Sequence, residues 1–249
     1  RGLLKQGYSF AKINGELYGI SNNNPNFSLA YSYYKMIKEF APHIKLVPVK
    51  RTGQNLNNEN LEMAQHLSAT AIRKNIMSEE ITSYISKELL EDIRASKIPT
   101  EEDFFELLKY KIISLGKDGL KNIYDMREGL ENRIFEAALS AKNYGELVEL
   151  VITKRYSKKK IQRLLIHVLT NTTRDDYEEL FGTKVFRVLA VKSEKSGLIR
   201  EINKEEKITL VSVLNSSNSM YFAQDIKVAR IYNLIAGKPD IFREKIELV

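Results

Sequence analysis

The chain has 249 residues, 43% of them hydrophobic, which is enough for one large domain or two to three small ones with buried cores. Its formal net charge of +7 favours an acidic partner, most commonly nucleic acid, although a basic surface kept for solubility would give the same balance. The absence of cysteine excludes disulfides, thiolate metal sites and cysteine nucleophiles, and three scattered histidines argue against a zinc site.

Membrane and export signals are missing from the sequence. No apolar run approaches the roughly 18 residues that a bilayer span requires, and no secretory hydrophobic segment follows Arg1. We therefore expect a cytoplasmic protein without a membrane partner. The chain begins with arginine rather than methionine, so we expect it to be the back part of a longer parent.

Residues 1–77 indicate an α/β segment. Apolar residues recur at helical spacing over 28–40, and the run HIKLVPVK (43–50) predicts a buried strand. A polar loop follows, and a second helix is expected to start near Thr70. The order helix, strand, loop, helix is half of an α/β nucleotide fold, in which ligands bind at the carboxyl ends of strands and at helix N-termini.

From Ser78 to residue 180 the pattern predicts helices alone. Ser78 is the expected N-cap of a helix over 78–95 with one apolar face: Ile81, Ile85, Leu89 and Ile93. Thr100 and Asp103 resemble a capping box. The clearest amphipathic helix covers 157–170, where five apolar residues share one face: Ile161, Leu164, Leu165, Val168 and Leu169. Residues 181–249 alternate again and predict a small α/β tail with strands at 184–191 and 207–214.

Polar residues of the α/β segment form a candidate anion site: Asn26, Arg51, Ser68, Thr70 and Arg73. Backbone N–H groups and the dipole at a helix start favour a phosphate, and the two hydroxyls and Arg73 would add charge-assisted hydrogen bonds. The alternative is that Ser68 only caps the helix while Arg73 is solvated.

A second candidate is the stretch TKRYSKKKIQR, which contains six cations and no acid: Lys154, Arg155, Lys158, Lys159, Lys160 and Arg163. On a helix, Lys159, Arg163 and His167 lie at i, i+4 and i+8 and form a ridge beside the buried face. Such crowded charges weaken a helix, whereas a phosphate backbone would offset their repulsion. Tyr156 could stack on an unpaired base. The alternative is a solvated basic face.

Five strings carry a resemblance to a known family: NPNFSLAYSYYKMI, VPVKR, LSATAIRKNI, NIYDMREGLENRI and TKRYSKKKIQRLLIHVL. In this order they resemble the C-terminal two-thirds of the bacterial tRNA(Met) cytidine acetate ligase family, nucleotidyltransferases that carry an HxGH motif. The resemblance runs from about Gly7 to the final helix. It implies the back part of a Rossmann-like nucleotidyltransferase domain (1–77), an all-helical tRNA-binding domain (78–180) and a small α/β tail (181–249).

The resemblance also implies an activity. Enzymes of that family use ATP to activate acetate as acetyl-adenylate and transfer the acetyl group to the wobble cytidine of elongator tRNA(Met). Asn26 and Arg51 then correspond to ATP contacts, and the Ser68, Thr70 and Arg73 group to a phosphate-binding motif. Mg²⁺ would normally accompany the nucleotide. The six cations of 154–163 fall where the tRNA is expected to lie.

The sequence departs from the family pattern at three points. Phe27 stands where the family has a second asparagine, and Ala30 replaces the usual glycine. No HxGH occurs in the chain, so the catalytic residues stay unknown and adenylation is expected only of a longer parent. Two alternatives remain open: a non-catalytic RNA-binding module, and a diverged nucleotidyltransferase with another acid or acceptor. An HxGH ahead of Arg1 would favour the ligase.

Overall fold

The computed structural model describes residues 13, 15–17, 25–49, 59–61, 66–182, 184–204, 208–240 and 247–248. The chain divides into two compact units, Arg1–Ser96 and Lys97–Val249. The expected division at residues 77 and 180 stays a prediction. Within the described ranges, every helix falls short of the length and hydropathy that a membrane crossing needs.

In the first unit the structure gives the bounds of α3 (Pro25–Phe40), α4 (Ala69–Lys74), the 3₁₀ helix η1 (Glu79–Ser83) and α5 (Lys87–Ala95). α3 covers the helix predicted over 28–40 and ends just before Pro42, whose ring disfavours helical backbone at the preceding residue. A small core joins α4, η1 and α5 through Ala71, Ile81 and Leu90.

The strand predicted at 43–50 is wrong over the described residues 43–49, which belong to no strand. Val47 and Val49 are 67% and 88% exposed. A strand forms only when its backbone N–H and C=O groups find partners on a neighbour, and Pro48 has no N–H to donate. Apolar residues alone therefore do not make residues 43–49 a strand.

The single helix predicted over 78–95 is two helices. Ser78 caps η1 as expected, since its hydroxyl accepts a hydrogen bond from the Glu80 N–H at 3.3 Å. Ser86 then caps α5 by accepting from the Leu89 N–H, also at 3.3 Å. This second start changes the helical phase, so that Leu90 is buried while Leu89, predicted to lie on the buried face, is 52% exposed.

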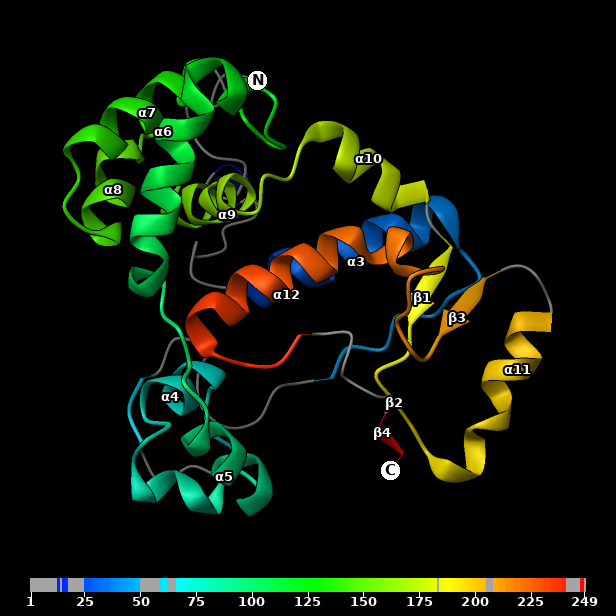
Figure 1. The fold of residues 1–249 in the computed structure, drawn as a ribbon. Coiled ribbons are helices and arrows are strands. Elements are labelled where there is room, and N and C mark those ends of the chain that lie inside the picture. Colours follow the sequence, from blue (N-terminus) through cyan, green and yellow to red (C-terminus); the bar gives the residue numbers. More distant parts are fainter. Residues whose placement is uncertain are drawn as a thin grey trace. The chain divides into compact units, whose positions relative to one another are not determined.

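The second unit begins with a bundle after η2 (Glu102–Phe104): α6 (Phe105–Lys121), α7 (Leu130–Ser140), α8 (Tyr144–Val151) and α9 (Lys158–Leu169). Figure 1 shows these helices packed together, and α6 contacts both α7 and α9. The amphipathic helix predicted over 157–170 is confirmed as α9, whose buried residues are Ile161, Leu164, Leu165 and Val168. Half of the predicted capping box forms: Asp103 accepts hydrogen bonds from the Thr100 N–H and hydroxyl, each at 2.7 Å, while the Asp103 N–H donates to the Thr100 carbonyl oxygen at 3.2 Å.

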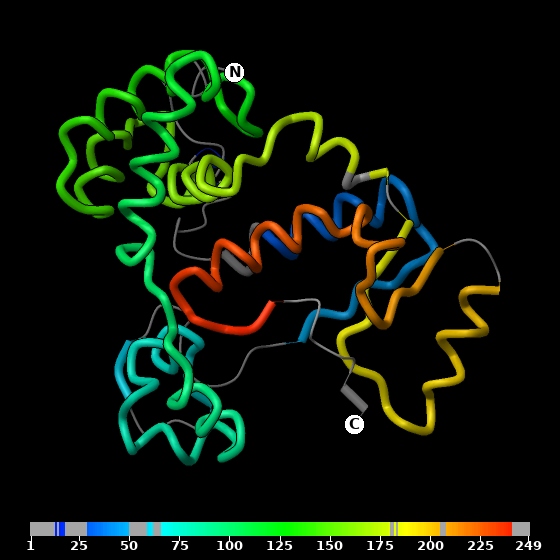
Figure 2. The backbone as a smooth tube through the Cα atoms, viewed as in Figure 1, coloured from blue at the N-terminus to red at the C-terminus, as the bar shows by residue number. Residues whose placement is uncertain are grey.

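The rest of the second unit is α/β: α10 (Arg174–Gly182), β1 (Val185–Arg187), β2 (Ala190–Val191), η3 (Ser193–Lys195), α11 (Gly197–Lys204), β3 (Thr209–Val211), η4 (Ser219–Phe222), α12 (Ala223–Ala236) and β4 (Glu247–Leu248). β1 pairs with β3 in parallel, with Phe186 opposite Leu210. Figure 2 traces the chain from β1 (yellow) through α11 to β3 (orange). β2 and β4 form a second parallel pair. The small α/β tail predicted from the sequence is therefore confirmed.

Candidate functional site

The predicted phosphate-binding group lies at the start of α4. Ser68 is fully buried, and its hydroxyl accepts a hydrogen bond from the Ala71 N–H at 2.9 Å, as the capping alternative expects. Thr70 is half-buried in the first turn, and Arg73 is exposed in the last. The structure thus brings the three residues onto one short helix. Their contacts with ATP stay a prediction.

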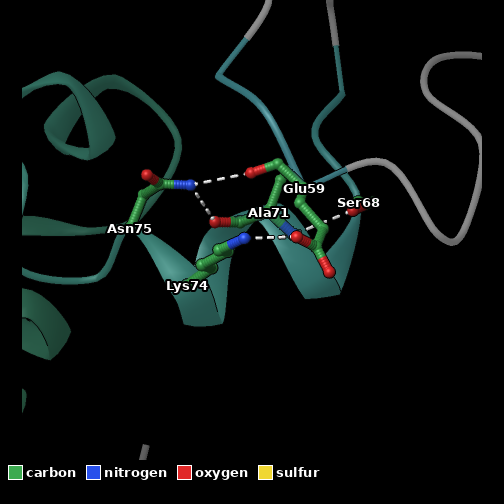
Figure 3. Close-up of polar contacts among 5 residues, drawn as sticks. All are labelled: Glu59, Ser68, Ala71, Lys74 and Asn75. Carbon is green, nitrogen blue, oxygen red and sulfur yellow. Dashed lines mark hydrogen bonds and ion pairs between the residues drawn. The ribbon is translucent and has the colours of Figure 1, made fainter.

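Glu59 ties the preceding loop to α4 (Figure 3). Its carboxylate forms an ion pair with Lys74, and its carbonyl oxygen accepts a hydrogen bond from Asn75 Nδ2 at 3.0 Å. Asn75 Nδ2 also donates to the Ala71 carbonyl at 2.8 Å, which closes the helix end. With Lys74 paired, Arg73 is the cation of α4 whose side chain makes no hydrogen bond or ion pair with a described residue.

The two other predicted ATP contacts lie largely beyond the described residues. Arg51 is outside them altogether. Asn26 is in the first turn of α3, but its side chain is not among those described. Both assignments stay predictions.

The predicted tRNA-binding cations lie in the turn before α9 and along α9 itself. Lys154, Lys159 and Arg163 are exposed, and their side chains form no hydrogen bond or ion pair with any residue of the described ranges. Lys158 is paired with Glu149 at 3.2 Å. The structure therefore leaves three of the cations uncompensated and accessible. Their contacts with tRNA stay a prediction.

Two of the six predicted cations are engaged locally. Lys160 is only 23% exposed and forms an ion pair with Asp125, which joins α9 to the turn before α7. The Arg155 guanidinium lies over the Tyr156 ring, 5.5 Å from its centroid. Tyr156 itself is half-buried against the bundle core, so its ring is less accessible to a base than the sequence implies.

Residues 122–127, which the sequence analysis left without a role, bring aromatic and charged groups next to Lys160 and His167 of α9. Tyr124 stacks on Tyr177 with ring centroids 3.5 Å apart and meets His167 edge-on at 5.2 Å. Burial lowers the pKa of His167, Lys160 and Arg163 lower it further, and Asp125 opposes them. The presence of NIYDMREGLENRI among the matching strings was the signal that could have directed attention to this turn.

Part of that same string is structural. The Arg133 guanidinium donates to the carbonyl oxygens of Leu150 at 2.8 Å and Ile152 at 3.3 Å. It thereby satisfies carbonyl groups at the end of α8, which have no partner within the helix. Arg133 is therefore a packing residue of the bundle rather than a candidate RNA contact.

Comparison with known proteins defines the class. The HIGH Nucleotidyl Transferase model matches residues 1–245, and the chain belongs to this family. Within that class it is similar to the tRNA(Met) cytidine acetate ligase of Staphylococcus aureus (strain JH9), with 30% identity over 239 residues. The match covers 94% of this chain and 62% of that protein, so the chain spans less than two thirds of the length of the curated relatives that it matches. The resemblance stated from the sequence is confirmed.

Solved structures support the fold. The apo form of Thermotoga maritima TmcAL matches with a TM-score of 0.78 and 20% identity, covering 99% of this chain and 68% of that one. A second form, bound with alpha-thio ATP, gives a TM-score of 0.73 and 19% identity over 98% of this chain and 67% of that one. The predicted α/β class, a nucleotidyltransferase fold rich in helices, is therefore confirmed.

Proposed function

We propose that this chain is the back part of an ATP-dependent ligase that activates acetate, or a similar small acid, as acetyl-adenylate. The acetyl group is then transferred to the wobble cytidine of elongator tRNA(Met). The observation that carries the proposal is the 30% identity to a tRNA(Met) cytidine acetate ligase over nearly the whole chain, within a nucleotidyltransferase family. ATP as substrate is further supported by the alpha-thio ATP named for the Thermotoga structure.

In the adenylation step, the acid's carboxylate attacks the α-phosphate of ATP and pyrophosphate leaves. Negative charge then grows on the phosphate oxygens, so fixed cations and N–H donors lower the barrier. We assign this role to Arg73 on α4 and to Arg51, with Asn26, Ser68 and Thr70 positioning the nucleotide. The accessibility of Arg73 supports its part, whereas the capping bond of Ser68 gives that residue a positioning role. Mg²⁺ arriving with ATP would neutralise further phosphate charge.

The tRNA would lie along α9. Support comes from Lys154, Lys159 and Arg163, whose charges face solvent uncompensated by any described acid. Counterion release from the RNA backbone gives such cations a large, salt-dependent share of the affinity. Lys158 and Arg155 extend the same surface, and Lys160 contributes mainly by holding α9 against the 122–127 turn.

The first test removes the α9 cations. A Lys159→Glu/Arg163→Glu variant is expected to bind methionine tRNA more weakly, with the slope of log affinity against log salt reduced by about two, because two phosphate contacts are lost. Filter binding over a series of salt concentrations measures both quantities. The matched control is Lys142→Glu/Lys238→Glu, which makes the same charge change at exposed positions outside α9. Equal binding by the two double variants would contradict a tRNA role for α9.

The second test addresses the chemistry. We expect acetate-dependent pyrophosphate release from ATP by the full-length parent protein that we propose, together with acetylation of the tRNA. Salt-sensitive tRNA binding without pyrophosphate release would favour the non-catalytic RNA-binding module. Pyrophosphate release without cytidine acetylation would favour a diverged enzyme with another acid or acceptor.

A further inference from the structure

A small cavity opens where the 122–127 turn meets α10. Its volume is about 190 Å³, and its lining consists of Tyr124, Asp125, Met126, Arg127, Arg174 and Glu178. This volume is below the roughly 300 Å³ at which pockets for drug-sized ligands begin, so the cavity fits one planar ring or one phosphate. We propose that it receives a single unpaired nucleotide of the RNA partner. The inference rests on the RNA-binding function proposed above and identifies which part of the RNA is held.

The cavity is built on a fastened turn. The Tyr124 N–H donates to the Thr172 carbonyl at 2.9 Å, and Arg174 Nη2 donates to the Met126 carbonyl at 3.0 Å. Asp125 has a φ of 64°, in the left-handed region that few non-glycine residues adopt. Such backbone persists where the surrounding contacts enforce it, and it is common at binding sites. The walls are therefore formed before any ligand arrives.

One aromatic ring, supported by a second, forms part of the lining. Tyr124 lines the cavity, and Tyr177 stacks on it at 3.5 Å with an interplanar angle of 15°. His167 contacts Tyr124 edge-on, which further fixes the orientation of the ring. Proteins hold unpaired RNA bases by stacking them on such aromatic side chains, each base contributing about 1–3 kcal/mol. Because Tyr177 and His167 already hold the Tyr124 ring in place, little conformational entropy is lost when a base stacks on it.

Charges around the rim favour a nucleotide over an apolar ligand. Arg127 lies 3.7 Å from Asp125, with 64% of its side chain exposed, while the other Asp125 oxygen pairs with Lys160. Because two cations compensate Asp125, its negative charge does not repel a phosphate. Glu178 offers an acceptor for the exocyclic amine of a base.

The cavity adjoins α9 through an ion pair. Lys160 of α9 pairs with Asp125, which lines the cavity, and Arg163 lies one turn further along the helix and influences the pKa of His167 together with Asp125 and Lys160. An RNA backbone that follows the exposed cations would therefore reach the cavity. A base within a duplex is stacked and paired and cannot enter, so the cavity selects single-stranded nucleotides.

Arg127→Ala and Tyr124→Leu test the proposal in the full chain. Fluorescence anisotropy would compare a single-stranded RNA oligonucleotide, a methionine tRNA transcript and a blunt RNA duplex of equal length. Tyr124→Leu is expected to bind the single strand and the tRNA roughly 5- to 150-fold more weakly, the loss that follows from one base stack. Arg127→Ala is expected to bind both more weakly because a cation at the rim is lost, and both variants are expected to bind the duplex like the unaltered chain. Arg127→Ala removes an exposed side chain, so its result stands even if Tyr124→Leu fails to fold.

Conservative variants and a control complete the design. Tyr124→Phe keeps the ring and should retain the affinity for single-stranded RNA. Arg127→Lys keeps the charge but loses the planar guanidinium, so its affinity should fall between those of the unaltered chain and Arg127→Ala. Lys142→Ala removes one charge at the far end of α7 from the cavity and should bind all three RNAs unchanged.

The outcomes separate the cavity from the wider RNA role. If the unaltered chain binds none of the three RNAs, both the proposed function and the cavity proposal fail. If Lys159→Glu/Arg163→Glu loses RNA binding while Arg127→Ala and Tyr124→Leu keep it, the cavity proposal is overturned and the proposed function stands. The cavity proposal is also overturned if Arg127→Ala and Tyr124→Leu weaken binding of the duplex as much as binding of the single strand, since the two residues would then make a general charge contact with RNA.

Discussion

His167 couples the α9 surface to pH through its neighbours. The side chain is half-buried at the edge of the Tyr124 ring, and the charges that act on it are Asp125, Lys160 and Arg163. Burial and the two cations lower its pKa, because each disfavours the protonated form, and the Asp125 carboxylate offsets only part of this. The folded chain therefore holds the imidazole in its neutral form more strongly than the unfolded chain does.

This gives a signed prediction for stability. As pH falls below about 6.5, the unfolded chain takes up the His167 proton first, so the free energy of unfolding decreases until the folded pKa is passed. His167→Gln should remove this part of the decrease. Urea unfolding at about pH 7.5 and 5.5 measures the effect, with His43→Gln as the control at an exposed histidine. The same pH dependence in His167→Gln and the unaltered chain would contradict the prediction.

Single residues also show where sequence reasoning stops. Six cations within eleven residues were visible in the sequence, but the acid that compensates Lys160 lies 35 positions away, at Asp125. The tertiary fold decides which cations have an acidic partner, because only the fold determines which acid lies beside which cation. For the same reason the sequence could not predict that Arg127 and Arg174 line the same cavity, because that depends on the contact between the 122–127 turn and α10.

At the scale of elements, caps decide where helices begin and which residues they bury. Ser86 starts α5 three residues after η1 ends, although the apolar pattern runs through both without interruption. Hydroxyl caps satisfy the first N–H groups of a helix and so fix its phase. α10 begins with a capping box: the Asp176 carboxylate accepts a hydrogen bond from the Thr173 N–H, and the Thr173 hydroxyl accepts one from the Asp176 N–H.

The phase of α5 can be tested with two adjacent leucines. Leu90 is 4% exposed in the core of the first unit and Leu89 is 52% exposed. Leu90→Ala should lower the free energy of unfolding by about 2–5 kcal/mol because it leaves a cavity, whereas Leu89→Ala should change it by no more than about 0.5 kcal/mol. Hydrogen exchange in peptides from 66–95 reports on this unit. A larger loss for Leu89→Ala would place the helix in the phase that the sequence predicted.

Elements differ in how far the sequence determines them. α9 was predictable because its five apolar residues recur at the spacing of one helical face, and a helix forms its hydrogen bonds within its own segment. Residues 43–49 carry an equally apolar pattern, yet a strand takes its hydrogen bonds from elsewhere in the chain. Local pattern therefore predicts helices better than strands here.

At the scale of the whole molecule, the family and fold class were predictable from five ordered strings, and the comparisons confirm both. The proposed ATP site stays a set of residue types, because its candidate members are scattered from Asn26 to Arg73 and Arg51 lies outside the described residues. The proposed RNA surface was predictable as a region, but the adjoining cavity and the cations that lack an acidic partner among the described residues required the packing of the second unit. The two proposed sites fall in different compact units, Arg1–Ser96 and Lys97–Val249.

The break within α6 has a consequence for handedness. Gly116 has a φ of 61° and a ψ of 177°, a conformation essentially reserved for glycine, yet an added Cβ would meet no atom of a described residue within 4 Å. Space is therefore available and only chirality forbids a side chain. For a D-alanine the mirrored angles fall in ordinary extended backbone, so the position would accept an amino acid of the opposite hand where L-alanine is strained.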